Sequence, residues 1–154
     1  GGSAALPVAG AAERADSFAL ANHSGLSLAS RVSPAAMVGF LRAAASLPAP
    51  RSAADAGLPG GVGPILRPYS IAARDVDLPE GEIRVLAKTG TMNFIRGLAG
   101  YVVTPAGRQL AFAIFSNDLE RRFSTGPAPR RWLGRAKRFE RALLRHWVRL
   151  ADDL

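Results

Sequence analysis

The sequence predicts an α/β fold of the α+β type, in which an antiparallel sheet of at least three strands is covered by a long C-terminal helix. Three runs of strand-forming residues, at 83–89, 98–104 and 109–116, follow one another in the second half of the chain. A turn with Pro and Gly at 104–108 pairs the last two runs as an antiparallel hairpin. Apolar residues then recur every three or four positions over 132–150, which is typical of an amphipathic helix.

The first half of the chain contains one well-marked helix and one long irregular stretch. Ser33 and Pro34 provide an N-cap and a first-turn proline, and apolar residues at helical spacing follow until Leu-Pro-Ala-Pro at 47–50 ends the helix. Residues 51–81 are interrupted by Pro and Gly, which predicts short helical or extended pieces. Loops of this length are usually functional or packed against another part of the protein.

The later elements are expected to form the core. The strand around Ala-Phe-Ala-Ile-Phe, at 111–115, is apolar on both faces and should be covered on two sides. The C-terminal helix should lie across the sheet through an apolar stripe, with both tryptophans in the core. The stripe comprises Trp132, Ala136, Phe139, Leu143, Trp147 and Leu150.

Composition excludes several classes of protein. The 154 residues are 48% hydrophobic and 21% charged, which is sufficient for a single domain with one hydrophobic core. There is no cysteine for a disulfide or thiolate metal site, and two histidines are too few for a His-rich site, so we expect no metal and no cofactor. No apolar run is long enough to cross a bilayer, and the N-terminal residues lack the pattern of a signal peptide. If the protein is exported, we expect the export signal outside this chain.

The net charge of +8 has two interpretations, an anionic partner or a general excess of arginine. The positive residues are concentrated in the last quarter, between Glu120 and Arg149, a range that includes the expected C-terminal helix. A basic helix is most often a solvated surface, so nucleic acid is not favoured as a partner.

Lys88 stands out because it is one of two lysines, the other eighteen basic residues being arginine. On a strand, Lys88 and Gly90 should share one face and Thr89 and Thr91 the other. A peptide can lie along an exposed sheet edge and form main-chain hydrogen bonds, while the ammonium and hydroxyls hold its terminal carboxylate. Gly90 would leave room for a catalytic segment, and an N–H near Thr91 would be an oxyanion donor. The alternative is an ordinary strand end, with a lysine that discourages aggregation.

Two segments resemble a known family. Residues 88–118, KTGTMNFIRGLAGYVVTPAGRQLAFAIFSND, are similar to the third signature and following strands of penicillin-binding proteins. Residues 22–37, NHSGLSLASRVSPAAM, resemble a segment of the D-alanyl-D-alanine carboxypeptidase/endopeptidase family, the class C low-molecular-mass penicillin-binding proteins. The order and separation of the two segments make the resemblance specific. It implies a penicillin-binding-protein/β-lactamase-like transpeptidase fold.

The resemblance also implies roles for particular residues. The Lys-Thr-Gly-Thr positions of the family bind the substrate carboxylate and contribute the oxyanion-hole N–H, and an apolar residue beside the substrate follows them. A Ser-Gly-Leu helps line the subsite for the peptide side chain. The matching residues here are Lys88, Thr89, Gly90, Thr91, Met92, Ser24, Gly25 and Leu26.

The chain departs from the family pattern in two ways. Neither the Ser-x-x-Lys that carries the nucleophile nor the Ser-x-Asn that assists proton transfer occurs in it. We therefore interpret residues 1–154 as the C-terminal portion of a DD-peptidase domain that lacks the nucleophile segment and is inactive alone. The family has Asp-Gly where this chain has Asn22-His23, so the carboxylate of the family is replaced by an amide here.

The first hypothesis is a serine D-Ala-D-Ala carboxypeptidase or endopeptidase that acts on the stem peptides of peptidoglycan through an acyl-enzyme. Its partners would be those peptides, β-lactams, which mimic them, and the N-terminal part of the same protein; its location would be periplasmic or extracytoplasmic. The second hypothesis is a noncatalytic basic module, or an inactive homologue, that binds an anionic partner through the C-terminal helix. That surface would comprise Arg135, Arg138, Arg141 and Arg145.

Overall fold

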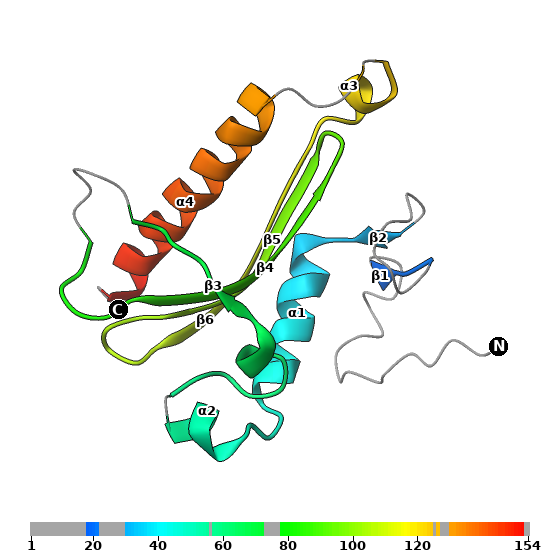
Figure 1. Cartoon of the computed structure of the whole chain (residues 1–154). Coiled ribbons are helices and arrows are strands. Elements are labelled where there is room, and N and C mark those ends of the chain that lie inside the picture. Colours follow the sequence, from blue (N-terminus) through cyan, green and yellow to red (C-terminus); the bar gives the residue numbers. More distant parts are fainter. Residues whose placement is uncertain are drawn as a thin grey trace.

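The computed structural model describes residues 18–21, 30–55, 57–72, 78–124, 126 and 130–152. It has the expected α+β architecture, with a four-stranded antiparallel sheet in the order β3-β4-β5-β6 (Figure 1). The strands are β3 (Arg67–Pro68), β4 (Arg84–Met92), β5 (Ile95–Val103) and β6 (Gln109–Asn117). Helices α1 (Pro34–Ala45) and α4 (Arg130–Asp152) cover opposite faces of this sheet, which we call the α1 face and the α4 face (Figure 1).

The remaining elements are short. They are β1 (Phe18–Ala19), β2 (Arg31–Val32), α2 (Arg51–Asp55), the 3₁₀ helix η2 (Gly63–Ile65) and α3 (Leu119–Ser124). Strands β1 and β2 pair antiparallel with each other. The stretch 51–81 thus contains the expected short helical and extended pieces in its described part.

Helix α1 begins and ends where the sequence predicts. The Ser33 Oγ accepts a hydrogen bond from the Ala36 N–H at 3.1 Å, which satisfies one of the free donors of the first turn. At the other end, the Gly60 N–H donates to the Ala45 carbonyl at 3.2 Å. A Cβ at Gly60 would lie 1.9 Å from the Leu47 carbonyl oxygen, so only glycine permits this approach. The irregular stretch is therefore packed against the end of α1, in agreement with expectation.

The strands extend further than the sequence suggested. The first continues past Thr89 to Met92, and the second begins at Ile95 instead of Leu98. A two-residue turn at 93–94, which the sequence analysis did not predict, joins β4 and β5. Phe94 has a positive φ of 50° there, and its buried ring packs edge-on against Trp132 at a centroid distance of 5.6 Å. Tertiary packing thus stabilises a turn that lacks the usual glycine.

Helix α4 is present as predicted, but part of its apolar stripe was assigned wrongly. Phe139 and Leu150 are about half exposed, at 53% and 50%. The buried positions are Trp132, Ala136, Glu140, Leu144, Val148 and Ala151. The helix is rotated because an acidic side chain, Glu140, occupies the middle of its buried surface. Within the described residues, no helix has the length and apolarity needed to span a membrane.

The core lies between the sheet and α4. Leu98 and Val102 of β5 contact Leu144 and Val148 of α4 in one buried cluster. Strand β6 is covered on both faces, as its sequence predicted, because α1 packs on the other side. There the buried Tyr101 hydroxyl donates to the Leu41 carbonyl at 2.6 Å.

A buried ion pair connects the sheet to α4. The Arg96 guanidinium donates from Nε to Glu140 Oε1 at 2.8 Å and from Nη2 to Oε2 at 3.1 Å. The Tyr69 hydroxyl donates to the same Oε2 at 3.0 Å. Glu140 is 0% exposed and Arg96 is 4% exposed, so neither charge has water as an alternative partner.

We predict that Glu140→Ala lowers the free energy of unfolding by about 3–5 kcal/mol, because it leaves the buried Arg96 cation without its partner. Urea denaturation measures this change. The combination Arg96→Met with Glu140→Leu should recover most of the stability, since no buried charge remains. As a control, Arg121→Ala removes the exposed pair with Asp118 and should cost less than about 1 kcal/mol. Equal losses at the two sites would contradict the prediction.

Two tyrosines should make stability depend on pH in the alkaline range. Burial raises the pKa of both Tyr69 and Tyr101, and for Tyr69 the hydrogen bond to Glu140 raises it further. A phenol that binds its proton more tightly in the folded state stabilises the protein below its unfolded pKa of about 10. That stabilisation is lost as the pH rises through the folded pKa. We expect denaturation midpoints to fall above about pH 10, and to fall less steeply in Tyr69→Phe and Tyr101→Phe. Parallel pH profiles for wild type and variants would contradict this.

Candidate functional site

The segment Lys88–Met92 lies along an open edge of the sheet. Strand β3 pairs with β4 only at Leu86 and Ala87, and the Tyr69 N–H adds one bond to the Val85 carbonyl at 2.8 Å. Beyond Ala87, β4 continues to Met92 with β5 on one side and no strand among the described residues on the other.

The backbone alternation determines which groups this open edge presents. Because the Val85 carbonyl points toward β3, the N–H and C=O groups of Ala87, Thr89 and Thr91 point to the same side. Those of Lys88 and Gly90 point to β5, opposite Ala99 and Gly97. The edge therefore offers the Thr89 and Thr91 main-chain groups, and the Thr91 N–H lies where the sequence analysis predicts an oxyanion donor.

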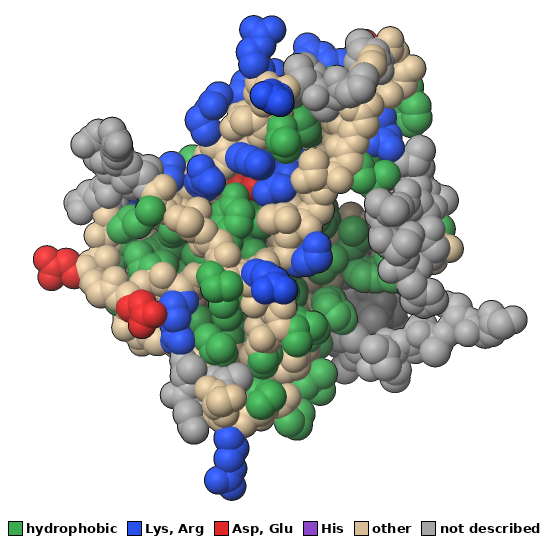
Figure 2. Space-filling model, viewed as in Figure 1, with side chains coloured by type: hydrophobic (Ala, Val, Ile, Leu, Met, Phe, Trp, Pro, Cys, Tyr) green, Lys and Arg blue, Asp and Glu red, His purple; other side chains and the backbone are tan. Residues whose placement is uncertain are grey.

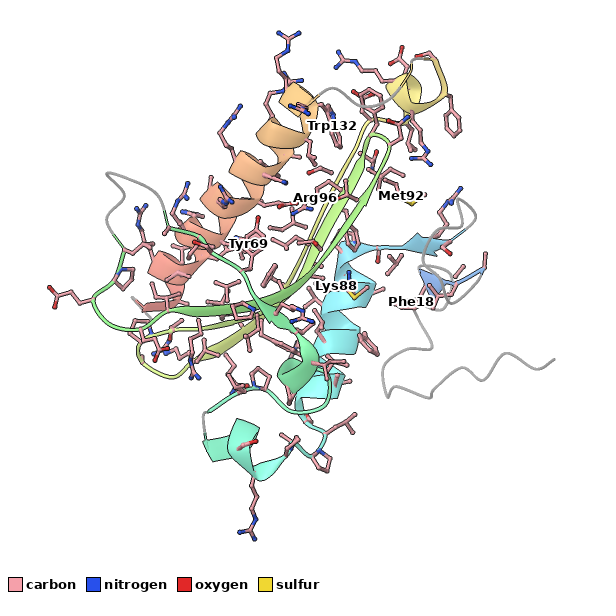
Figure 3. The ribbon with its side chains drawn as sticks, viewed as in Figure 1. Phe18, Tyr69, Lys88, Met92, Arg96 and Trp132 are labelled. Atoms are coloured by element: carbon pink, nitrogen blue, oxygen red, sulfur yellow. The ribbon has the colours of Figure 1, made fainter. Side chains whose placement is uncertain are left out.

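The side chains alternate as the sequence predicted. Lys88, Gly90 and Met92 lie on the α1 face, and Thr89 and Thr91 lie on the α4 face. Lys88 and Met92 are labelled in Figure 3. Lys88 is exposed, and its Nζ donates to the Thr89 carbonyl at 2.8 Å. A Cβ at Gly90, on the same face as the Lys88 side chain, would meet no atom of the described residues within 4 Å.

The Thr91 hydroxyl is held by a residue that the sequence analysis did not single out. The Arg96 Nη1 donates to the Thr91 Oγ1 at 2.9 Å, and the two residues are direct cross-strand partners. Figure 3 shows Arg96 in the layer between the sheet and α4, on the same side as Tyr69. A sequence signal did exist. Glu140 lies four residues after Ala136 and four residues before Leu144, which places this single acid on the same apolar side of the helix. Such an acid needs a buried cation as partner.

The hairpin that carries the site is fixed at its tip. Phe94, Trp132 and Ala136 form a second buried cluster. The Arg122 guanidinium donates to the Asn93 carbonyl, and the Asp118 N–H donates to the Phe94 carbonyl at 3.0 Å. These contacts hold the end of β4 at the N-terminal end of α4, which gives the open edge a rigid support.

The arrangement suits an extended ligand with an anionic end. It combines one ammonium, outward main-chain donors and acceptors, and a hydroxyl fixed by a guanidinium. The described residues contain no group of His, Asp and Glu side chains that could hold a metal ion.

Three of the predicted site residues lie outside the described residues. They are Ser24, Gly25 and Leu26, and the neighbouring Asn22-His23 lies outside as well. Their placement beside Lys88 therefore stays a prediction.

The arginines of α4 do not form one continuous exposed surface. Lys and Arg side chains gather over α4 on the face drawn in Figure 2. Arg135 and Arg138 are exposed, but Arg145 donates to the Ile71 carbonyl at 3.1 Å. The Arg141 Nε is buried and forms no hydrogen bond within the described structure. Two of the four arginines proposed to bind an anionic partner are thus turned toward the protein.

Comparison with known proteins gives one match. Residues 4–128 match the family model of D-Ala-D-Ala carboxypeptidase 3, the S13 family. This range includes residues 22–37 and 88–118, the two segments that carried the resemblance. No curated protein and no solved structure matches the chain.

The open edge predicts an alternating pattern of amide hydrogen exchange along β4. The Thr89 and Thr91 amides should exchange at least about tenfold faster than the Lys88 and Gly90 amides, which are paired with β5. Exchange followed by two-dimensional NMR on the isolated chain measures the four amides together. Equal protection of all four would show that another segment covers this edge.

Proposed function

Because the chain belongs to the D-Ala-D-Ala carboxypeptidase 3 (S13) family, we propose that it forms the substrate-carboxylate and oxyanion side of a serine carboxypeptidase cleft. The resemblance to D-alanyl-D-alanine carboxypeptidases is thereby confirmed, and the family indicates peptidase activity on D-Ala-D-Ala ends in peptidoglycan metabolism. The proposal assigns the binding of those ends to the open edge of β4.

One observation carries the proposal: the Lys88 ammonium, on the Thr89 carbonyl, and the outward Thr91 N–H lie along the same strand edge, which has no partner strand among the described residues. A stem peptide that ends in acyl-D-Ala-D-Ala would lie antiparallel along this edge and pair with the Thr89 and Thr91 main chain. The Lys88 ammonium and the threonine hydroxyls would bind its terminal carboxylate. The oxygen of the scissile carbonyl would accept a hydrogen bond from the Thr91 N–H, and this bond would strengthen as negative charge develops on the oxygen.

The existing bond of Lys88 is compatible with this role. Its Nζ already reaches the edge, where it donates to the Thr89 carbonyl at 2.8 Å. An ammonium has three donors, so it retains two for a carboxylate or turns away when a substrate N–H takes its place.

The chemistry requires a nucleophilic serine in the Ser-x-x-Lys pattern of the family, and this chain does not contain that pattern. No serine in it has Lys three residues later or Asn two residues later. We place the nucleophilic serine and its lysine base in a preceding segment of the same protein, within a penicillin-binding-protein-like fold at an extracytoplasmic location. The serine oxygen attacks the carbonyl carbon as its proton passes to the base. The C–N bond then breaks, D-Ala leaves with that proton, and water hydrolyses the acyl-enzyme.

The alternative, a basic module that binds an anionic partner through α4, has less support. It needs the four arginines as one surface, whereas Arg145 and Arg141 are directed into the protein. Affinity for an anionic polymer that is lost when Arg135 and Arg138 are neutralised, and kept in Lys88→Ala, would favour this alternative.

We predict that Lys88→Ala lowers the rate of acylation of the complete enzyme by a labelled penicillin about ten- to a hundredfold. The variant loses a charged hydrogen bond to the carboxylate, worth about 1.5–3 kcal/mol. Lys137→Ala, which changes the other lysine, on α4, is the matched control and should acylate at the wild-type rate.

The 154-residue chain alone should take up no covalent label. A covalent penicillin adduct on it would contradict the placement of the nucleophile in another segment. Normal acylation of Lys88→Ala in the complete enzyme would contradict the assigned carboxylate site.

A further inference from the structure

The Arg96 guanidinium donates hydrogen bonds to two different residues, Glu140 on α4 and Thr91 on β4. Two of its nitrogens, Nε and Nη2, bind the Glu140 carboxylate, while Nη1 donates to the Thr91 Oγ1 at 2.9 Å. Arg96 is 4% exposed, so it does not reach solvent or a ligand directly. Thr91 is exposed and lies at the edge where the substrate is proposed to bind. The threonine therefore lies between a buried cation and the proposed carboxylate.

The direction of the hydrogen bond determines what the Thr91 hydroxyl can do. A hydroxyl has one donor and two acceptor sites, whereas a guanidinium has donors only. Arg96 occupies an acceptor site of the Thr91 hydroxyl. Because the guanidinium has no acceptor, the threonine cannot donate a hydrogen bond to it. Its O–H remains directed elsewhere, and the nearby positive charge makes it a stronger donor. A hydroxyl fixed in this way donates to a ligand oxygen, and it binds a carboxylate oxygen more strongly than the neutral oxygen of an amide, because an ionised acceptor strengthens the hydrogen bond.

Glu140 determines where the third nitrogen points. The bidentate contact fixes the plane of the guanidinium, and the pair is buried between β5 and α4. A lysine at this position would keep the charge but lack the planar geometry that serves Glu140 and Thr91 together.

We propose that Arg96 is a positioning residue that orients the Thr91 hydroxyl as a donor to the substrate carboxylate, and thereby sets the preference for a free C-terminal carboxylate. This inference rests on the proposed function. It assigns to Arg96 no contact with the substrate.

The test compares two peptides with the complete enzyme, one that ends in D-Ala-D-Ala carboxylate and one that ends in the corresponding amide. The measured quantity is the ratio of the two kcat/KM values. In Arg96→Lys we expect kcat/KM to fall about tenfold for the carboxylate peptide and to change less than about twofold for the amide. Thr91→Val should produce the same loss. The double variant Thr91→Val/Arg96→Lys should show no further loss, because both substitutions remove the same interaction.

A second variant keeps the test valid if Arg96→Lys does not fold. Arg96→Met combined with Glu140→Leu removes the donor to Thr91 without leaving a buried charge, and it should lose the same preference. Tyr101→Phe is the control for lost stability, because its hydroxyl bonds to Leu41 on the other face of the sheet. Its ratio should equal that of wild type.

The outcomes separate the two proposals. A folded Arg96→Lys or Arg96→Met/Glu140→Leu enzyme that retains the wild-type ratio would overturn the inference alone, provided Lys88→Ala still impairs acylation. Losses that multiply in Thr91→Val/Arg96→Lys would also overturn it, because the two residues would then act independently. A wild-type enzyme that hydrolyses neither peptide would overturn the proposed function and this inference with it.

Discussion

The fold depends on the requirement that a buried charge has a partner. Glu140 is inaccessible to water, so α4 must lie where its carboxylate meets the Arg96 guanidinium. That contact acts together with the packing of Leu144 and Val148 in the buried cluster, and the two fix the rotation of α4 about its axis and its position along β5. Since Arg96 also bonds to Thr91 on the neighbouring strand, the same constraint extends to the edge of β4. The candidate site is thus coupled to the core through side chains and through the backbone ladder.

Much of the fold follows from local signals in the sequence. Ser33 and Pro34 specify the start of α1 because capping and a fixed φ act within one turn. The turn at 104–108 specifies the β5–β6 hairpin for the same reason. The alternation of Lys88 and Thr89 between the two faces follows from the period of a strand, once the segment is assigned as a strand. These features need no information about distant residues.

The features that could not be predicted all depend on contacts between distant segments. Hydrophobic periodicity treats Glu140 as a surface residue, so it selected Phe139 for the buried side of α4, although Phe139 is exposed. The turn at Asn93-Phe94 lacks glycine, and contacts with distant residues, the Phe94 ring with Trp132 and the Phe94 carbonyl with the Asp118 N–H, offset the cost of its positive φ. The contact of Arg96 with Thr91 was missed for the same reason, since the orientation of the guanidinium depends on Glu140, which is forty-four residues away.

Lys88 has two interpretations. It is a charge that discourages strand pairing at an exposed edge, or it is a ligand for a carboxylate, and the two follow from the same physical property. An unpaired strand edge is open to any extended chain, and a charged side chain over it disfavours neutral strands. The ammonium lies on the Thr89 carbonyl, at the position where a partner strand would begin to pair. An extended chain that continues past this point must move the ammonium off the Thr89 carbonyl, and it offers no negative charge in exchange. A peptide that ends there brings a carboxylate to bind it. On the proposed function, a lysine that disfavours the pairing of neutral strands at this edge would also favour chain ends over chain interiors, which is the discrimination that a carboxypeptidase requires.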